Sequence, residues 1–145
     1  MIASPTYPKL TAPIATTNSH VCMMRAKKNA TELKGMLSAN QKAARALSKY
    51  LAWVEQNYAD HDEVTAADEL QRLYAAEEGF QFLSFPSVSS VGQNCASLHY
   101  EPKRDACAKL IANTTYLCDS GANYTDGTTD TTRTLWLGDG AVESV

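Results

Sequence analysis

The sequence lacks an apolar run long enough to cross a membrane, and its N-terminus lacks a basic segment followed by an apolar one. The first absence argues against a membrane-spanning protein, and the second against a secretory signal peptide. A basic stripe is also missing, and the net charge of −3 is mild, which argues against nucleic acid as a partner. We therefore expect no membrane and no nucleic-acid partner, and a cytoplasmic location by default.

Cysteine is scarce and irregularly spaced. The four cysteines form no C-x-x-C pair, which argues against a zinc knuckle. An even count permits two disulfides, but without a secretory signal we expect free and mostly buried thiols. These residues are Cys22, Cys95, Cys107 and Cys118.

The length of 145 residues and the apolar content of 44% are typical of one compact globular domain. Three prolines and many Ser and Thr residues interrupt Met1–Val21, which we interpret as an irregular lead-in or linker. Residues 22–145 would then form the domain. No sustained periodicity in the first segment suggests a regular element.

Two helices are predicted before any strand. Asn29 with Glu32 forms a capping box, and apolar residues at helical spacing extend the first helix over about Ala30–Tyr58. Its apolar stripe is expected to be core: Leu33, Met36, Leu37, Asn40, Ala44, Leu47, Leu51 and Val54. Its lysines and arginine are expected to form a solvated face: Lys27, Lys28, Lys34, Lys42, Arg45 and Lys49.

A second helix is expected after a polar link. The link is Asp60–Glu63, where His61 among carboxylates is better explained as a solvated loop residue than as a metal ligand. Thr65 with Asp68 resembles a helix cap, and Gly79 would end the helix. The expected class is therefore α+β, with two helices packed on an antiparallel sheet.

Strand-like patterns occupy the second half of the chain. Phe82–Val91 contains Pro86 and is expected to be an edge or irregular strand. A turn follows, and Cys95–Tyr100 is expected to be a strand that carries His99. The stretch Tyr116–Leu135 combines two β-prone runs with the turn residues between them, so it predicts a β-hairpin.

Acidic residues cluster near the bend of this hairpin. If the bend centres on Tyr124-Thr125, Asp119 and Asp130 oppose each other directly. Opposed like charges are destabilising, and a divalent cation between them would remove the penalty. If the turn is Asp126-Gly127 instead, the two no longer oppose each other unless a bulge intervenes. From spacing alone, their use as turn-forming residues and N–H acceptors is the favoured explanation.

Three segments resemble one protein family. The sequence DSGANYTDGTTDTTRT, residues 119–134, closely resembles the metal-site segment of the Xaa-Pro aminopeptidases (aminopeptidase P) in the creatinase/methionine aminopeptidase superfamily. Upstream, SFPSVSSVGQNCASLHYEP (Ser84–Pro102) resembles the strand pair that carries an active-site histidine. MRAKKNATELKGM (Met24–Met36) resembles the start of the first helix of the catalytic domain.

The resemblance implies half of a pita-bread fold and a metal-dependent peptidase. Asp119 and Asp130 would be ligands of two divalent ions, expected to be Mn with Zn or Co as alternatives, and His99 would hold or polarise the substrate. The substrate would be a peptide with proline in second position. The two ions would activate a water molecule for removal of the residue that precedes proline.

The resemblance also implies further ligands, one histidine and two glutamates, that this sequence does not supply. We therefore expect the N-terminal half of a catalytic domain that is inactive alone. A second copy of the chain or the missing C-terminal half would complete it. An uncovered apolar face would promote association. The alternative is a catalytically inactive pita-bread-like interaction module.

Overall fold

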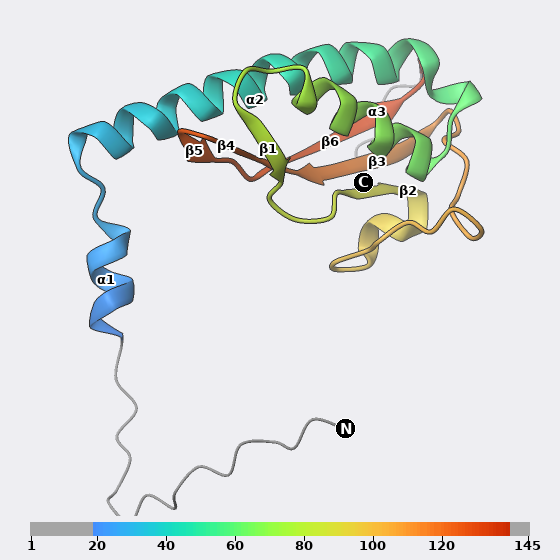
Figure 1. The fold of residues 1–145 in the computed structure, drawn as a ribbon. Coiled ribbons are helices and arrows are strands. Elements are labelled where there is room, and N and C mark those ends of the chain that lie inside the picture. Colours follow the sequence, from blue (N-terminus) through green and yellow to red (C-terminus); the bar gives the residue numbers. More distant parts are fainter. Residues whose placement is uncertain (1–18, 140–145) are drawn as a thin grey trace, which may run out of the picture.

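Helices and strands occupy separate layers in this protein (Figure 1). The structure is a computed structural model that describes residues 19–139. Helices α2 and α3 lie side by side on one face of the strands, which form two three-stranded antiparallel sheets in the orders β1-β4-β5 and β2-β3-β6. This is the predicted α+β arrangement. No helix of the described residues is long and apolar enough to cross a membrane.

A short helix, α1 (His20–Ala26), precedes the two long ones. The Ser19 hydroxyl caps it by accepting a hydrogen bond from the backbone N–H of Cys22 at 3.4 Å. The prediction of an irregular lead-in over residues 1–21 is therefore wrong at its end, and residues 1–18 lie outside the described part. Helix α1 buries no residue and stands apart from the two layers (Figure 1).

Helix α2 (Ala30–Asn57) begins with the predicted capping box of Asn29 and Glu32. The face that it buries differs from the predicted stripe, because Leu33 and Leu37 are 58% and 62% exposed. Of the predicted stripe, Leu47 and Val54 are buried. Three alanines of the buried face allow a close approach to the strands, and the whole buried face is Ala39, Ala43, Ala46, Leu47, Tyr50 and Val54. The predicted basic face is only partly solvated, because Lys42 pairs with Asp126 at 2.9 Å.

Helix α3 (Glu63–Ala75) begins earlier than predicted. Asp62 is its N-cap, and Thr65 is the third helical residue of a capping box. The backbone hydrogen bond from Thr65 lowers the pKa of Asp62 from 3.8 to about 2. His61 is not a solvated loop residue either, because its ring packs on Trp53 with a centroid distance of 4.6 Å.

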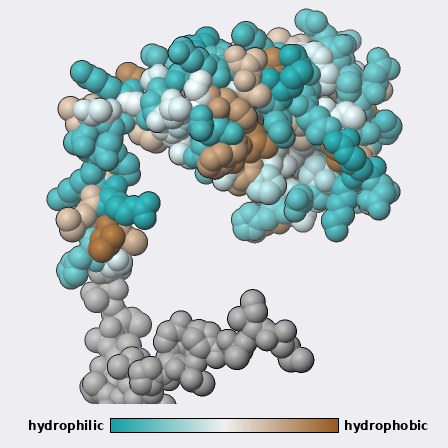
Figure 2. Space-filling view, viewed as in Figure 1, coloured by the Kyte–Doolittle hydropathy of each residue, from teal (hydrophilic) through white to brown (hydrophobic). Residues whose placement is uncertain are grey.

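The predicted strand over Phe82–Val91 is broken into two. The segment around Pro86 separates β1 (Phe80–Leu83) from β2 (Val88–Val91), and these two strands belong to different sheets. Figure 2 shows apolar side chains gathered near β1, where Phe82 is 64% exposed. Association of the isolated chain through such surfaces stays a prediction.

One long hairpin links the two sheets. It consists of β3 (Thr114–Ser120), β4 (Ala122–Tyr124), β5 (Gly127–Thr128) and β6 (Thr131–Leu137). The register is the same from Thr114↔Leu137 to Tyr124↔Gly127, so the bend centres on Thr125-Asp126. Both predicted bend positions are wrong by one residue.

Tertiary contacts explain this position of the bend. The backbone N–H of Thr125 donates to the carbonyl of Gly79 at 2.9 Å, and the Lys42 ammonium holds the Asp126 carboxylate. Gly35 of α2 packs against the Asp126 carbonyl with no room for a Cβ atom. Contacts with the helix layer and Gly79 therefore fix the position of the bend, and local turn preferences do not.

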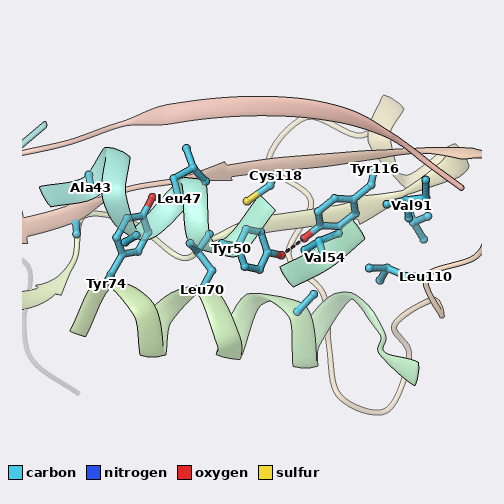
Figure 3. Close-up of a cluster of buried hydrophobic side chains, with 14 of the residues drawn as sticks. Ala43, Leu47, Tyr50, Val54, Leu70, Tyr74, Val91, Leu110, Tyr116 and Cys118 are labelled. Atoms are coloured by element: carbon cyan, nitrogen blue, oxygen red, sulfur yellow. Dashed lines mark hydrogen bonds between the residues drawn. The ribbon is translucent and has the colours of Figure 1, made fainter. Parts of the chain in front are cut away.

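The core lies between the helices and the sheet (Figure 3). Tyr116 and Tyr50 are fully buried and share a hydrogen bond, and the Ser89 hydroxyl contacts Tyr116 at 2.8 Å. Cys118 is 1% exposed, and burial raises the pKa of its thiol to about 12. A packing role for Cys118 is confirmed. The four cysteines are free as predicted, but only Cys118 is buried.

Candidate metal centre

The two faces of β3 differ in burial. Tyr116, Cys118 and Ser120 point into the core, whereas Leu117 and Asp119 are half-buried on the opposite face, which we call the open face. Alternation of side chains along a strand accounts for this division. Across the ladder, Asp119 is opposed by Thr132, whose hydroxyl donates a hydrogen bond to Asp119 Oδ1 at 2.8 Å. Asp119 is thus oriented from the neighbouring strand.

Asp130 lies directly before β6 and is exposed. Thr128 and Thr132 are exposed as well, while Thr129 is 3% exposed and Thr131 is half-buried. This alternation puts Asp130 on the open face with Thr132, the partner of Asp119. The register therefore makes Asp119 and Asp130 diagonal neighbours on one face. In a regular ladder such neighbours are about 7–8 Å apart.

The predicted direct opposition of Asp119 and Asp130 is wrong. Continuation of the register opposes Asp130 to Gly121, where the chains are too close for a side chain. A Cβ atom at Gly121 would lie 2.4 Å or less from Ser84 and Thr129 atoms. Gly121 therefore contributes no side chain opposite Asp130, next to the two carboxylates.

The third acidic residue of the hairpin has a different use. The Asp126 carboxylate accepts two hydrogen bonds from Lys42 Nζ, at 2.9 and 3.0 Å. These hydrogen bonds are the main reason why the pKa of Asp126 is lowered. Asp126 therefore fixes the bend to α2 and is not available to a site on the open face.

His99 is not on a strand. After β2 the chain forms a 3-10 helix, η2 (Gly92–Ala96), and an irregular connection to β3, so the predicted strand Cys95–Tyr100 is wrong. His99 is exposed and has a φ of 55°, in the left-handed region that few side-chain-bearing residues adopt. Residues 19–139 contain no group of three or more His, Cys, Asp or Glu side chains that could hold a metal ion. His99 is thus not a third ligand beside the two aspartates.

Glu63 is a buried carboxylate that the sequence motifs do not single out. It is fully buried, and its carboxylate accepts four hydrogen bonds from the chain around the His99 connection. The helical spacing of α3 does indicate its burial, because Glu63 lies on the same stripe as the buried Ala66, Leu70 and Tyr74. A carboxylate on an apolar stripe requires donors within the core.

Comparisons with known proteins show the family of this chain. The model of metallopeptidase family M24 matches residues 34–144. The chain belongs to this family. A probable Xaa-Pro aminopeptidase P from Pyricularia oryzae is 48% identical over 124 residues, which are 83% of this chain and 20% of the relative. A second, from Metarhizium acridum, is 48% identical over 118 residues, which are 79% of this chain and 19% of that relative.

Solved structures of the family share the fold. An X-prolyl aminopeptidase from Caenorhabditis elegans, described as a cytosolic enzyme with a di-nuclear active site, has a TM-score of 0.79 and 35% identity, over 85% of this chain and 21% of that one. An X-Pro aminopeptidase from Thermotoga maritima has a TM-score of 0.70 at 24% identity, over 83% of this chain and 32% of that one, and supports the fold alone. The predicted half of a pita-bread fold is confirmed. The chain spans about a fifth of the length of the curated relatives.

Proposed function

We propose that this chain contributes one part of the dinuclear metal centre of an aminopeptidase that removes an N-terminal residue preceding proline. Asp119 and Asp130 would be metal ligands, and His99 would contact the substrate. The observation that carries the proposal is the common open face of the two aspartates, within a segment that the metallopeptidase model matches. The nematode relative with its di-nuclear active site supports the same function.

Asp119 and Asp130 fit a divalent metal in part. Carboxylate oxygens are suitable ligands for Mn, and for Zn or Co as alternatives. The Thr132 hydroxyl bonds to Asp119 Oδ1 and leaves Oδ2 available, which is the kind of outer contact that orients a metal ligand. Two carboxylates do not complete a coordination shell. The other ligands would come from outside residues 19–139 or from another chain.

Bound divalent ions would supply a water molecule of lowered pKa and polarise the scissile carbonyl. The chain's own residues would do the rest of the work in this half of the site. Asp119, held by Thr132, would keep its carboxylate in one orientation. His99, exposed on its connection, would donate a hydrogen bond to the peptide substrate. The core behind Asp119 excludes water through Tyr116 and Cys118, which are 0% and 1% exposed.

One observation favours the alternative of a catalytically inactive interaction module. The described residues bring together only two of the acidic or histidine groups that a metal needs. In addition, eight large apolar residues are more than half exposed: Val21, Met23, Met24, Leu33, Leu37, Phe82, Leu98 and Ile111. A module that binds another protein would need such surfaces and no metal.

Calorimetric titration of Mn and Zn into the chain separates the two functions. The test compares the chain with an Asp119→Asn/Asp130→Asn variant. An Asp126→Asn variant is the matched control, because Asp126 belongs to the same hairpin but pairs with Lys42. Metal binding that the double variant loses and the control keeps supports the peptidase. No binding beyond that of the double variant means that the site needs ligands from outside the chain, or that the chain is a non-catalytic module.

A further inference from the structure

Glu63 is the one charged residue among residues 19–139 that is fully buried. Burial of a carboxylate is costly unless hydrogen bonds replace its water. Glu63 Oε1 accepts from the backbone N–H of Val91 at 2.8 Å and from Asn94 Nδ2 at 2.9 Å. Its Oε2 accepts from the Tyr100 hydroxyl at 2.7 Å and from the backbone N–H of Ala108 at 2.9 Å. All four donors are close and two of them are side chains.

The four donors follow the path of the connection that carries His99. Val91 ends β2, Asn94 lies in η2, and Ala108 lies on the way back to β3. Ladder pairing stops at Val91 and resumes at Thr114, with an isolated bridge between Lys109 and Asp62 in the interval. Between these two points, one carboxylate from the first turn of α3 binds the start, the middle and the return of the connection.

Tyr100, a donor to Glu63, directly follows His99 in the chain. The Tyr100 hydroxyl also receives a hydrogen bond from Asn94 Nδ2 at 3.0 Å, so the phenol is held from two sides. Burial, followed by the hydrogen bond to Glu63, raises the pKa of Tyr100 to about 12. The phenol therefore keeps the proton that it donates. A left-handed φ such as that of His99 persists only where the surroundings enforce it.

We propose that Glu63 is a positioning residue that acts through the Tyr100 hydroxyl to hold His99 in place for the substrate. This inference rests on the proposed function, because it gives His99 its task. Glu63 would thus support the site without touching metal or substrate. Without the contact, the His99 backbone would relax toward negative φ and the imidazole would sample many positions.

NMR spectroscopy of the whole chain tests the proposal with a Tyr100→Phe variant, which removes one hydroxyl and keeps the ring. The sequence has three histidines, so the His99 ring signal can be compared with those of His20 and His61 in the same spectrum. We expect the His99 signal to shift and broaden while the other two stay unchanged. The hydrogen-bonded amides of Ser97 and Tyr100 should exchange about ten- to hundredfold faster.

Two further variants separate positioning from general destabilisation. Glu63→Gln keeps the shape of the side chain but places an amide NH2 against the donors. We expect the same shift of the His99 signal and faster exchange of the Ser97 and Tyr100 amides, and also faster exchange of the Ala108 amide. Tyr116→Phe removes a buried hydroxyl that bonds to Tyr50 and Ser89 and to none of the donors of Glu63, and it should leave the His99 signal unchanged. If Glu63→Gln does not fold, Tyr100→Phe alone decides.

An unchanged His99 signal and unchanged exchange in Tyr100→Phe would overturn the proposal. The same changes in Tyr116→Phe would overturn it too, because they would follow from lost stability. These measurements use the metal-free chain. A failed metal titration would thus count against a metal site in this chain and leave the contacts of Glu63 with Tyr100 and Asn94 unaffected, so the two failures are distinguishable.

Discussion

The hairpin of β3 to β6 and the connection between β2 and β3 each carry predicted site residues but hold them differently. In the hairpin, an unbroken register orients Asp119 and Asp130 through backbone pairing and alternation. In the connection, the buried carboxylate of Glu63 substitutes for pairing around His99. A ladder distributes the ordering over many weak bonds, whereas the connection is held by the Glu63 carboxylate and by an isolated bridge between Asp62 and Lys109. The two parts of the candidate site should therefore respond differently to mutation.

Removal of the Glu63 carboxylate should have the largest effect and should act on the connection. Glu63→Ala leaves four donors without an acceptor, all of them in buried or half-buried surroundings. We expect the free energy of unfolding to fall by about 3 kcal/mol or more. Urea denaturation measures this loss. Glu55→Ala, at an exposed position of α2, should change it by about 0.5 kcal/mol at most.

An equal loss in the two variants would contradict the role of Glu63. A Glu63→Ala chain that keeps hydrogen-exchange protection in β3 and β6 while losing it over residues 92–108 would give the sharpest form of the comparison. The hairpin would then be shown to be independent of the buried carboxylate.

A substitution in α2 should weaken the hairpin instead. In an exposed helix interior, Gly→Ala stabilises by about 1 kcal/mol. At Gly35 the added methyl group would meet the Asp126 carbonyl at the bend, so we expect Gly35→Ala to destabilise by about 1–3 kcal/mol. Thermal unfolding measures the sign. Ser48→Ala, exposed on the same helix, is the control and should be neutral or slightly stabilising. A gain in stability for Gly35→Ala would show that the contact between α2 and the bend does not restrict this position.

The smallest expected effect is on the loss of folding stability at acidic pH. Asp62 caps the helix that presents Glu63, and its pKa is lowered from 3.8 to about 2. A lowered pKa means that the ionised group stabilises the fold above pH 3.8, and that this contribution is lost as the pH falls toward about 2. Asn also caps helices but does not titrate. Asp62→Asn should therefore lose less stability over this interval, and parallel curves would contradict the assignment.

Much of this molecule is predictable from its sequence, and the exceptions share a cause. The capping box of Asn29 and Glu32 located α2 because all of its signals are local. The bend was misplaced by one residue, because contacts from Gly79 and Lys42 to the hairpin decide it. Both contacts come from residues far from the hairpin in the sequence, so the turn residues alone do not reveal them.

The same cause applies to the candidate site. A common location for Asp119 and Asp130 was predictable from the hairpin, but direct opposition was not, because it required the exact register. A strand carrying His99 was predicted from local β-propensity. The side chains of Asn94 and Tyr100 bind to Glu63 instead, and no local pattern reveals this pairing. The roles of Asp119, Asp130 and His99 stay predictions.

The most direct test of the central claim is the NMR spectrum of the chain with a small amount of Mn, which broadens the amide signals close to its binding site. If Asp119 and Asp130 hold a metal together on the open face, broadening should be strongest in residues 118–120 and 130–133. It should be weak at the exposed acids Glu101 and Asp105 of the connection, and absent in the double Asn variant. Equal broadening at all exposed carboxylates, or none at the hairpin, would contradict the account.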